Sequence, residues 1–359
     1  MNDTFADRLL RWFDQHGRRD LPWQRRTGSA SDDAYRVWLS EVMLQQTQVS
    51  TVRGYFERFI TALPTLRDVA AAEEDQVFAL WSGLGYYRRA RFLHQAAQIC
   101  VARHGGELPA DFAALSALPG IGRSTAGAIL AQAWGQHWPI LDANVQRVLA
   151  RYHGVPGYPG QTAVHKQLWL HAQANTPIAR VADYTQAIMD LGATVCLSRA
   201  PLCVHCPLAS NCIAYRDNLT GELPARKPAR VSPTRVTLML VLRDRGQRVL
   251  LERRGAAGVW SGLWSLPEAS DSDSALRLAG RYAQLGDAQA LNAFTHVFTH
   301  YRLHISPLLF DRVRAHHAVA DNPQLHWYAA DELLALGLPA PVRRLLLQIN
   351  DSASPCAAK

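Results

Sequence analysis

Apolar side chains recur three and four positions apart over the first 218 residues, which is the period of an α-helix with one buried face. The stretch after Asp33 shows the pattern most clearly, with the polar residues Glu41, Gln45 and Gln48 on a separate face. Its apolar stripe consists of Trp38, Val42, Val49, Val52, Phe56 and Phe59. Further helices are predicted over residues 66–81, 86–103, 111–117, 123–134, 143–152, 162–174 and 180–191.

The pattern changes at residues 219–235, a proline-rich and basic stretch with little apolar periodicity. We interpret it as an interdomain linker. Beyond it, runs rich in β-branched and aromatic residues predict strands over 235–244, 248–254, 294–310 and 325–330, with helices near 273–284 and 331–347. The sequence therefore predicts an all-α region over residues 1–218, a smaller α+β domain over 236–350 and a disordered tail over 351–359.

Composition adds a hint about partners but does not decide the function. The 359 residues carry a formal net charge of +8, which suits a polyanion such as nucleic acid, although many basic proteins bind none. No run of about 18 apolar residues is present, so no membrane span is expected. The N-terminus lacks the pattern of a secretory signal, and we expect a cytoplasmic location.

The stretch "LPGIGRSTAGAIL", residues 118–130, predicts a tight turn between two helices. Gly120 and Gly122 allow close approach of a neighbour, and the second helix begins with unpaired N–H groups at its positive end. This arrangement is a helix-hairpin-helix that can clamp a DNA phosphate without reading sequence. The alternative is a plain corner between helices with glycine caps. A Walker P-loop is excluded because no Gly-Lys-Ser/Thr follows.

Two carboxylates are candidates for acid–base chemistry, although neither is diagnostic alone. Asp142 in "PILDANVQRVLARY" precedes a helical stripe, so it is also a good N-cap. Glu41 in "WLSEVMLQQTQV" lies on a polar helix face, where most glutamates are merely solvated.

Four cysteines lie close together in "CLSRAPLCVHCPLASNC", with the spacing C-x6-C-x2-C-x5-C. In a chain without a secretory signal, such clustering indicates a metal site rather than disulfides. The single C-x2-C pair and the uneven remaining spacings favour a [4Fe–4S] cluster over structural zinc. The four candidate ligands are Cys196, Cys203, Cys206 and Cys212. Cys100 is predicted in the core, and Cys356 stands alone in the tail.

The hairpin, Asp142 and the cysteine spacing together resemble the endonuclease III superfamily of DNA base-excision enzymes. Within it, "LSEVMLQQTQV", "GLGYYRRAR" and "LPGIGRSTAGAIL" make essentially the whole chain similar to the A/G-specific adenine DNA glycosylases, the MutY family. The resemblance implies an all-α helix-hairpin-helix glycosylase domain, comprising a six-helix barrel and a [4Fe–4S] cluster loop, followed by an α+β Nudix-like (MutT-like) domain. It also implies a monomer that excises adenine opposite 8-oxoguanine or guanine in duplex DNA.

The same resemblance suggests catalytic roles for individual residues. It makes Glu41 the acid that protonates the adenine and helps position water, and Asp142 the ionised carboxylate that stabilises the positive sugar. Asn144 is then a residue that orients either water or Asp142. The fourth candidate at the catalytic site is Ser124, whose position in bifunctional relatives holds a lysine that forms a Schiff base; serine cannot form one. Adenine glycosylases often carry another lysine where this chain has Gln146. We therefore expect a monofunctional glycosylase with little strand-cleaving activity.

Residues that engage DNA follow from the resemblance as well. Gln46, Leu84 and Tyr86 match the wedge near the opposite base; core packing is the alternative for the last two, but the neighbouring glycines favour an exposed turn. The arginines that we expect at DNA phosphates are Arg25, Arg88, Arg89 and Arg91, for which a solvated surface is the alternative.

The C-terminal domain resembles the Nudix fold but lacks the hydrolase signature. After "SLPE", residues 265–268, the acidic cluster that would bind Mg²⁺ is absent from the sequence, so nucleotide hydrolysis is disfavoured. Recognition of 8-oxoguanine is then expected at Phe298, Thr299 and His300, where the family has Phe-Ser-His. The alternative is that these three are ordinary alternating strand residues.

Two other function classes remain open at this point. One is a bifunctional pyrimidine-type glycosylase and lyase, which Ser124 and the C-terminal domain oppose. The other is a non-enzymatic DNA-binding or zinc-binding module, which would release no base.

Overall fold

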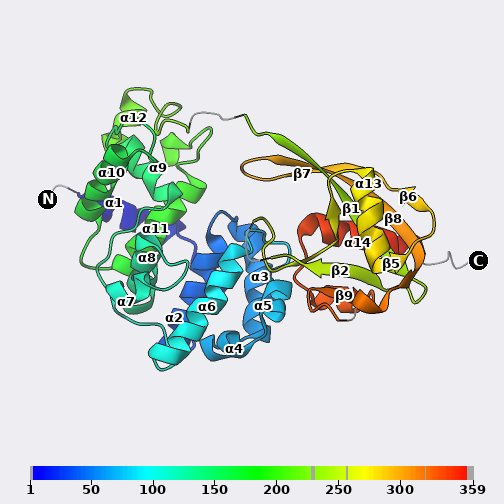
Figure 1. Cartoon of the computed structure of the whole chain (residues 1–359). Helices are drawn as coiled ribbons and strands as arrows, with labels where there is room; N and C mark the ends of the chain where they lie inside the picture. Colours follow the sequence, from blue (N-terminus) through cyan, green and yellow to red (C-terminus); the bar gives the residue numbers. More distant parts are fainter. Residues whose placement is uncertain (1–2, 228–230, 256–257, 320, 354–359) are drawn as a thin grey trace, which may run out of the picture. The chain divides into compact units, whose positions relative to one another are not determined.

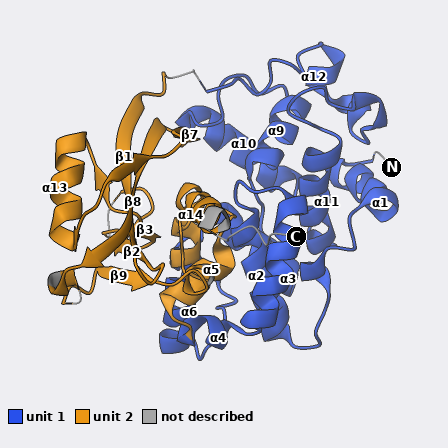
Figure 2. Cartoon of the chain, turned by 90° about the vertical axis from the view of Figure 1, so that its right-hand side faces the viewer, with its two compact units in different colours: residues 1–71, 92–229 blue, residues 72–91, 230–359 orange. Residues whose placement is uncertain are grey.

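The computed structural model describes residues 3–227, 231–255, 258–319 and 321–353, and the chain folds into two compact units. Unit 1 contains residues 1–71 and 92–229, and unit 2 contains residues 72–91 and 230–359, as coloured in Figure 2. The second unit therefore takes a segment from within the predicted helical region as well as the C-terminal part of the chain. Among the described residues, no helix is long and apolar enough to cross a membrane.

Unit 1 is built from helices (Figure 1). They are α1 (Phe5–His16), α2 (Ala30–Leu44), α3 (Val49–Ala62), α4 (Leu66–Ala71), most of α6 (Arg88–Arg103), α7 (Phe112–Ser116), α8 (Arg123–Trp134), α9 (Ala143–Tyr152), α10 (Thr162–Asn175), α11 (Val181–Thr194) and α12 (Ile213–Arg216). Short 3-10 turns lie at η1 (Pro22–Gln24), η2 (Cys203–His205) and η3 (Ala209–Asn211).

Two predicted helices are each divided in the structure. The single stripe expected after Asp33 belongs to α2 and α3, because the chain turns at Gln46, whose φ is 59°. The predicted helix over 66–81 is likewise split into α4 and α5 (Glu74–Trp81). The apolar pattern continues through both breaks because the helices on either side of each break, α2 with α3 and α4 with α5, all bury apolar residues. Periodicity alone therefore does not reveal where one helix ends and the next begins.

Glycines bring the helices of the first unit into close contact. A Cβ at Gly127 of α8 would lie 2.7 Å from the carbonyl oxygen of Pro139, and one at Gly192 of α11 would lie 2.6 Å from the Cβ of Asn144 in α9. Only hydrogen fits at these positions, so α8 and α11 pack directly against the segment on either side of Asp142. Around them lies a core shared by α1, α8, α9, α10 and α11.

Unit 2 contains α5 and a nine-stranded mixed sheet with helices on both faces. Its strands are β1 (Thr234–Asp244), β2 (Val249–Arg253), β3 (Trp264–Ser265), β4 (Glu268–Ala269), β5 (Ala283–Gln284), β6 (Ala288–Ala290), β7 (Phe294–Val297), β8 (Arg302–Ala315) and β9 (Leu325–Tyr328). Its other elements are α13 (Ser272–Tyr282), α14 (Ala340–Ala353), η4 (His317–Val319) and η5 (Glu332–Ala335).

Alternate residues of the central strand β1 explain the layering of this sheet. Met239 and Val241 share a core with α14, whereas Leu240 and Leu242 share one with α13. Strand β1 pairs in parallel with β8, from Thr234 opposite Arg302 to Leu242 opposite Phe310. A strand buried on both faces accounts for its nearly continuous apolar sequence.

Two further expectations for the C-terminal region are corrected. The single strand expected over 294–310 is divided into β7 and β8, which pair antiparallel. Helix α14 extends to Ala353, so residues 351–353 are helical rather than part of a disordered tail. The rest of the expected tail, residues 354–359 with Cys356, lies outside the described residues.

Substituting Gly192 by alanine tests the close contact of α9 and α11. The added Cβ would force the backbone of α9 aside, so we expect a loss of about 1–3 kcal/mol in the free energy of unfolding. The matched control is Gly54 in α3, where the nearest atom would be the tip of Arg58 at 3.8 Å. Gly54→Ala should stabilise unit 1 by about 0.4–1 kcal/mol. Denaturant unfolding of both variants measures the difference, and an equal effect of the two would contradict the packing described.

Candidate active site

A cleft of about 740 Å³ in unit 1 brings the two predicted carboxylates together. Glu41 comes from α2, and Asp142 and Asn144 come from the start of α9, a hundred residues later in the chain. The other walls of the cleft belong to the first turn of α3, to α11 and to the loop that follows it. The structure therefore assembles three of the four predicted catalytic residues in one cleft.

Glu41 lies in the last turn of α2, where its carboxylate accepts a hydrogen bond from Gln132 of α8, with 2.9 Å between Nε2 and Oε1. Burial raises the pKa of Glu41 from 4.5 to about 7; the Gln132 bond opposes this rise and the nearby charge of Asp142 adds to it. The folded protein thus keeps a proton between pH 4.5 and about 7 that the unfolded chain releases. Its free energy of unfolding must fall as pH rises through that window.

Asp142 both caps a helix and lines the cleft. Its Oδ1 accepts the backbone N–H of Val145 at 2.8 Å, so it is the N-cap of α9, and it also lines the cleft. Burial raises its pKa, whereas the Val145 bond and the charge of Arg147 act in the opposite direction. Asp142 is therefore the N-cap that the sequence allowed for and also lines the cleft, while its catalytic role stays a prediction.

Ser124 stands outside the residues that line this cleft. Its Oγ accepts the backbone N–H of Leu141 at 2.9 Å, one residue before Asp142. The hydroxyl therefore holds the segment that leads into Asp142, and the expected place of Ser124 at the chemistry stays a prediction.

Gln132 and Arg147 complete the site and were not identified from the sequence. Arg147 donates to Oδ1 of Asn144 at 2.8 Å and to the carbonyl oxygens of Gly192 and Cys196. It thereby joins the amide in the cleft to the end of α11 and to the cysteine loop. Both residues act through contacts with residues distant in sequence, which no local pattern reveals.

The predicted hairpin is present between α7 and α8. Gly120 has a φ of 78° and leaves room for Phe92, whose Cβ would lie 2.9 Å from an added Cβ, and Gly122 is the N-cap of α8. Ile121 between them is buried and anchors the turn. Arg123 lies over the ring of Trp169, 3.8 Å from its centre. The exposed first turn of α8 is thus presented by a fixed scaffold.

The predicted DNA-engaging residues of unit 1 are accessible. Gln46 is exposed in the turn between α2 and α3, and Arg25 is exposed after η1. Both are therefore available to a ligand in the folded unit.

In unit 2 the corresponding residues divide into exposed and buried ones. Tyr86 is 50% exposed with a φ of 51°, and Arg88 is exposed, but Leu84 is only 6% exposed, which contradicts its expected place on an exposed turn. Arg89 is buried against the carbonyl oxygens of the same turn, so the structure does not offer it to a phosphate. The same holds for Arg91, which pairs with Glu74 and binds Ser261.

The four clustered cysteines lie in the loop between α11 and α12 and line a single pocket with Arg151. None of them forms a disulfide, and Arg151 donates to Sγ of Cys196 at 3.3 Å. Burial raises the pKa of Cys206 to about 12 and also raises the pKa values of Cys203 and Cys212, so without a ligand the loop favours neutral thiols.

The four thiols share one pocket. Among the described residues, no three His, Cys, Asp or Glu side chains are placed as a metal ion requires. The fit of the loop to a metal group therefore rests on its donor set, four cysteines in one short loop. Cys100, by contrast, is buried in the core as predicted.

The predicted recognition residues of unit 2 form a loop, so the alternative of alternating strand residues is wrong. Phe298 follows β7 and donates its N–H to the carbonyl oxygen of Tyr301, with the two rings stacked at 4.6 Å. The ring of Trp260 lies 5.2 Å from that of Phe298. Thr299 and His300 are exposed at the tip of the loop.

Two family models match the chain in the order of its predicted domains. Residues 39–174 match the HhH-GPD superfamily of base excision DNA repair proteins, and residues 238–348 match the NUDIX domain. In class, the chain is thus a helix-hairpin-helix base excision repair protein with a C-terminal NUDIX domain.

Relatives of known name narrow the class to a family. The adenine DNA glycosylase of Buchnera aphidicola subsp. Acyrthosiphon pisum is 34% identical over 343 residues, covering 95% of this chain and 96% of its own. The adenine DNA glycosylase of Homo sapiens is 38% identical over 315 residues, covering 74% of this chain and 58% of its own. The chain belongs to the adenine DNA glycosylase family.

Solved structures agree with the fold of the helical region. A thermostable thymine-DNA glycosylase is 27% identical, with a TM-score of 0.52 over 59% of this chain and 95% of its own. Endonuclease III in a non-covalent complex with DNA is 20% identical, with a TM-score of 0.50 over 60% of this chain and 94% of its own. Together with the family matches, these confirm the predicted fold class.

Substituting Ser124 tests its positioning role. Ser124→Ala leaves the buried N–H of Leu141 without its acceptor, so we expect a loss of about 1–3 kcal/mol in the free energy of unfolding. Ser124→Thr keeps the hydroxyl and serves as the control. Thermal unfolding compares the variants; equal stability of Ser124→Ala and the parent would show that the bond contributes nothing.

Proposed function

We propose that this protein hydrolyses the N-glycosidic bond of adenine paired with 8-oxoguanine or guanine in duplex DNA. The observation that carries the proposal is the cleft in which Glu41, with a pKa of about 7, faces the same space as Asp142. A carboxylic acid and a carboxylate in one site suit a reaction whose transition state resembles an oxocarbenium ion. The relatives' name, adenine DNA glycosylase, supports adenine as the base.

The proposed reaction begins with extrusion of the adenosine from the duplex, which costs a few kcal/mol. Protonated Glu41 donates its proton to the adenine ring, and the Gln132 amide keeps the carboxyl group in place. The Asp142 carboxylate stabilises the positive sugar as the bond breaks. Asn144, held by Arg147, is placed to orient the attacking water. Ser124 cannot form an imine, so release of the base occurs without a Schiff-base intermediate at this position.

Several exposed groups are proposed to hold the DNA around this step. The first turn of α8 with Gly120 and Gly122 receives a backbone phosphate, and Arg25 and Arg88 add positive charge. Gln46 and Tyr86 fill the space that the extruded base leaves. In unit 2, the loop of Phe298, Thr299 and His300 is proposed to recognise 8-oxoguanine. Leu84 would join the wedge only if it left its buried position.

We also propose that Cys196, Cys203, Cys206 and Cys212 hold a [4Fe–4S] cluster. Bound there, the cluster supplies four metal–thiolate bonds that cross-link the loop, and its role is structural. Arg151 and Arg147 supply the positive charge that offsets the thiolates. We further expect the protein to act as a monomer in the compartment that holds its chromosomal substrate, which is the cytoplasm in a bacterium.

Base release from an A:8-oxoguanine duplex tests the activity directly. We expect adenine release with strand breaks only after alkali, because no lysine stands at position 124 to open the sugar. Borohydride should trap no adduct. Strand cleavage without alkali would contradict the monofunctional mechanism, and failure to release adenine from A:8-oxoguanine and from A:G would contradict the proposed function.

Replacing Glu41 by glutamine separates chemistry from folding. Glu41→Gln should abolish base release while DNA binding persists, and the parent's rate should fall as pH rises past about 7, because the acid form of Glu41 is lost. The variant should unfold at a higher temperature than the parent at pH 8 and at the same temperature near pH 4.5. Retained turnover would remove Glu41 from the mechanism; unchanged stability at pH 8 would contradict its raised pKa.

The cluster has an optical test that is independent of catalysis. The purified protein should be brown, with an absorption band near about 410 nm. Replacing Cys206 by serine should remove most of this absorbance and lower the unfolding temperature, whereas Cys100→Ser, a change in the core, should leave the band in place. A colourless protein that contains zinc would contradict the assignment.

A further inference from the structure

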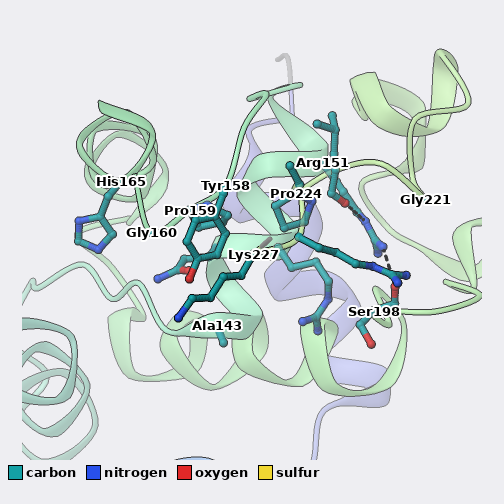
Figure 3. Close-up of a pocket in the computed structure, with 15 residues that line it drawn as sticks. Ala143, Arg151, Tyr158, Pro159, Gly160, His165, Ser198, Gly221, Pro224 and Lys227 are labelled. Atoms are coloured by element: carbon teal, nitrogen blue, oxygen red, sulfur yellow. Dashed lines mark hydrogen bonds between the residues drawn. The ribbon is translucent and has the colours of Figure 1, made fainter. Parts of the chain in front are cut away.

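A second pocket, of about 560 Å³, lies next to the candidate active site in unit 1. Arg147 and Ser198 line both spaces, so the pocket is adjacent to the cleft that holds Asp142. Its floor is the outer face of α9, including Ala143 and Gln146. In Figure 3, His165 and Ser198 stand on opposite sides, and Lys227 extends between them on the side of Tyr158.

The lining of this pocket is strongly basic. Arg147, Arg151, Arg226, Lys227 and His165 contribute to it, and no acidic side chain does so among the described residues. Arg226 and Lys227 are exposed. Arg147 uses Nε and Nη2 in the hydrogen bonds already described, while its Nη1 has no hydrogen-bond partner in the described part of the chain. Positive charge from the arginines of α9 and from Arg226 and Lys227, with open space between them, is an arrangement that favours an anion.

Hydrogen bonds hold the walls of this pocket in place. Arg151, only 3% exposed, donates from Nε to the carbonyl oxygen of Leu223 at 2.9 Å and from Nη2 to that of Thr220 at 2.7 Å. The N–H of Ala225 bonds to the carbonyl oxygen of Gly157 at 3.1 Å. The segment that carries Arg226 and Lys227 is therefore attached to α9 and to the loop after it.

On the opposite wall, the ring of Tyr158 packs over Gly160. A Cβ at Gly160 would lie 2.3 Å from Cε1 of Tyr158, so the aromatic ring occupies the space that any other residue would fill. This close packing seats Tyr158 against the pocket, where its ring forms an apolar side to a basic cavity. An apolar wall with cations on the other sides suits a backbone unit, in which a sugar adjoins each phosphate.

We propose that this pocket binds one phosphate of the DNA strand whose base enters the cleft, with Arg226 and Lys227 as its main cations. The inference rests on the proposed function, because the pocket shares two lining residues with the cleft and therefore lies next to the strand whose base would enter it. The segment that carries Arg226 and Lys227, which the sequence predicts as a linker, is then also part of the DNA-binding surface. Arg147 lines this pocket and also donates to Asn144. A phosphate in the pocket would therefore help to fix the position of the Asn144 side chain in the cleft.

The test uses the double variant Arg226→Ala/Lys227→Ala of the full-length holoprotein. Its ligand is a duplex with a tetrahydrofuran abasic analogue opposite 8-oxoguanine, which allows no turnover. The matched control is Arg103→Ala/Lys166→Ala, which removes two exposed positive charges of unit 1 outside the pocket. We expect affinity to fall roughly 3- to 30-fold and the slope of log Kd against log salt to decrease by roughly 1–2 in the first variant only. Equal losses in both variants would overturn the proposal.

A methylphosphonate scan locates the phosphate. Neutralising single phosphates of the adenine-bearing strand should reveal one position that weakens binding to the parent but not to the pocket variant. Additive losses at every position would overturn the proposal. Competition by inorganic phosphate at constant ionic strength, without such a position, would assign the pocket to a free anion and overturn it as well. Because all of these are binding measurements, they remain decisive even if adenine release fails.

Discussion

The buried guanidinium of Arg151 is the contact on which the arrangement of the helical unit depends. It donates to Sγ of Cys196, to the carbonyl oxygens of Leu197 and Ser198, and to those of Thr220 and Leu223. A buried charge that lost these partners would cost several kcal/mol, so the residue can remain buried only while both loops stay in place. One side chain of α9 thereby holds together the cysteine loop and the segment that leaves the unit.

The active site begins at the other end of the same helix. Asp142 caps α9, Ser124 fixes the residue before it, and Gly192 lets α11 approach Asn144. The cysteine loop and Asp142 are thus both anchored to α9. A loop that lost its order would disturb Arg147, which bonds to both Cys196 and Asn144, and through it the cleft. For the proposed cluster, these contacts give a structural link to the cleft that requires no part in the reaction.

Sequence reasoning was most accurate where local rules act alone. The predicted bounds of α8 and α9 agree with the structure because Gly122 and Asp142 are caps and Gly135 ends α8 in a left-handed conformation. It failed where tertiary contacts decide. The break at Gln46 leaves the apolar period unchanged, and Leu84 is buried although glycines surround it. Ser124 was expected at the chemistry because its position had meaning in relatives, yet its bond to Leu141 is visible only in three dimensions.

Unit 2 contains a helix, α5, that comes from the N-terminal half of the chain. Helix α5 supplies Phe78, whose Cβ would lie 2.4 Å from a Cβ at Gly337, and Glu74 and Asp75, which pair with Arg253. Tyr87 and Ser82 bond to Leu338 and Arg343 on the other side of this contact. Unit 2 is therefore assembled from two separate stretches of chain and is not one continuous C-terminal segment. A chain that ended before residue 230 would lose the residues that pack against α5 and would expose apolar side chains of that helix. Removal of the NUDIX domain is therefore expected to destabilise the part of the chain that remains.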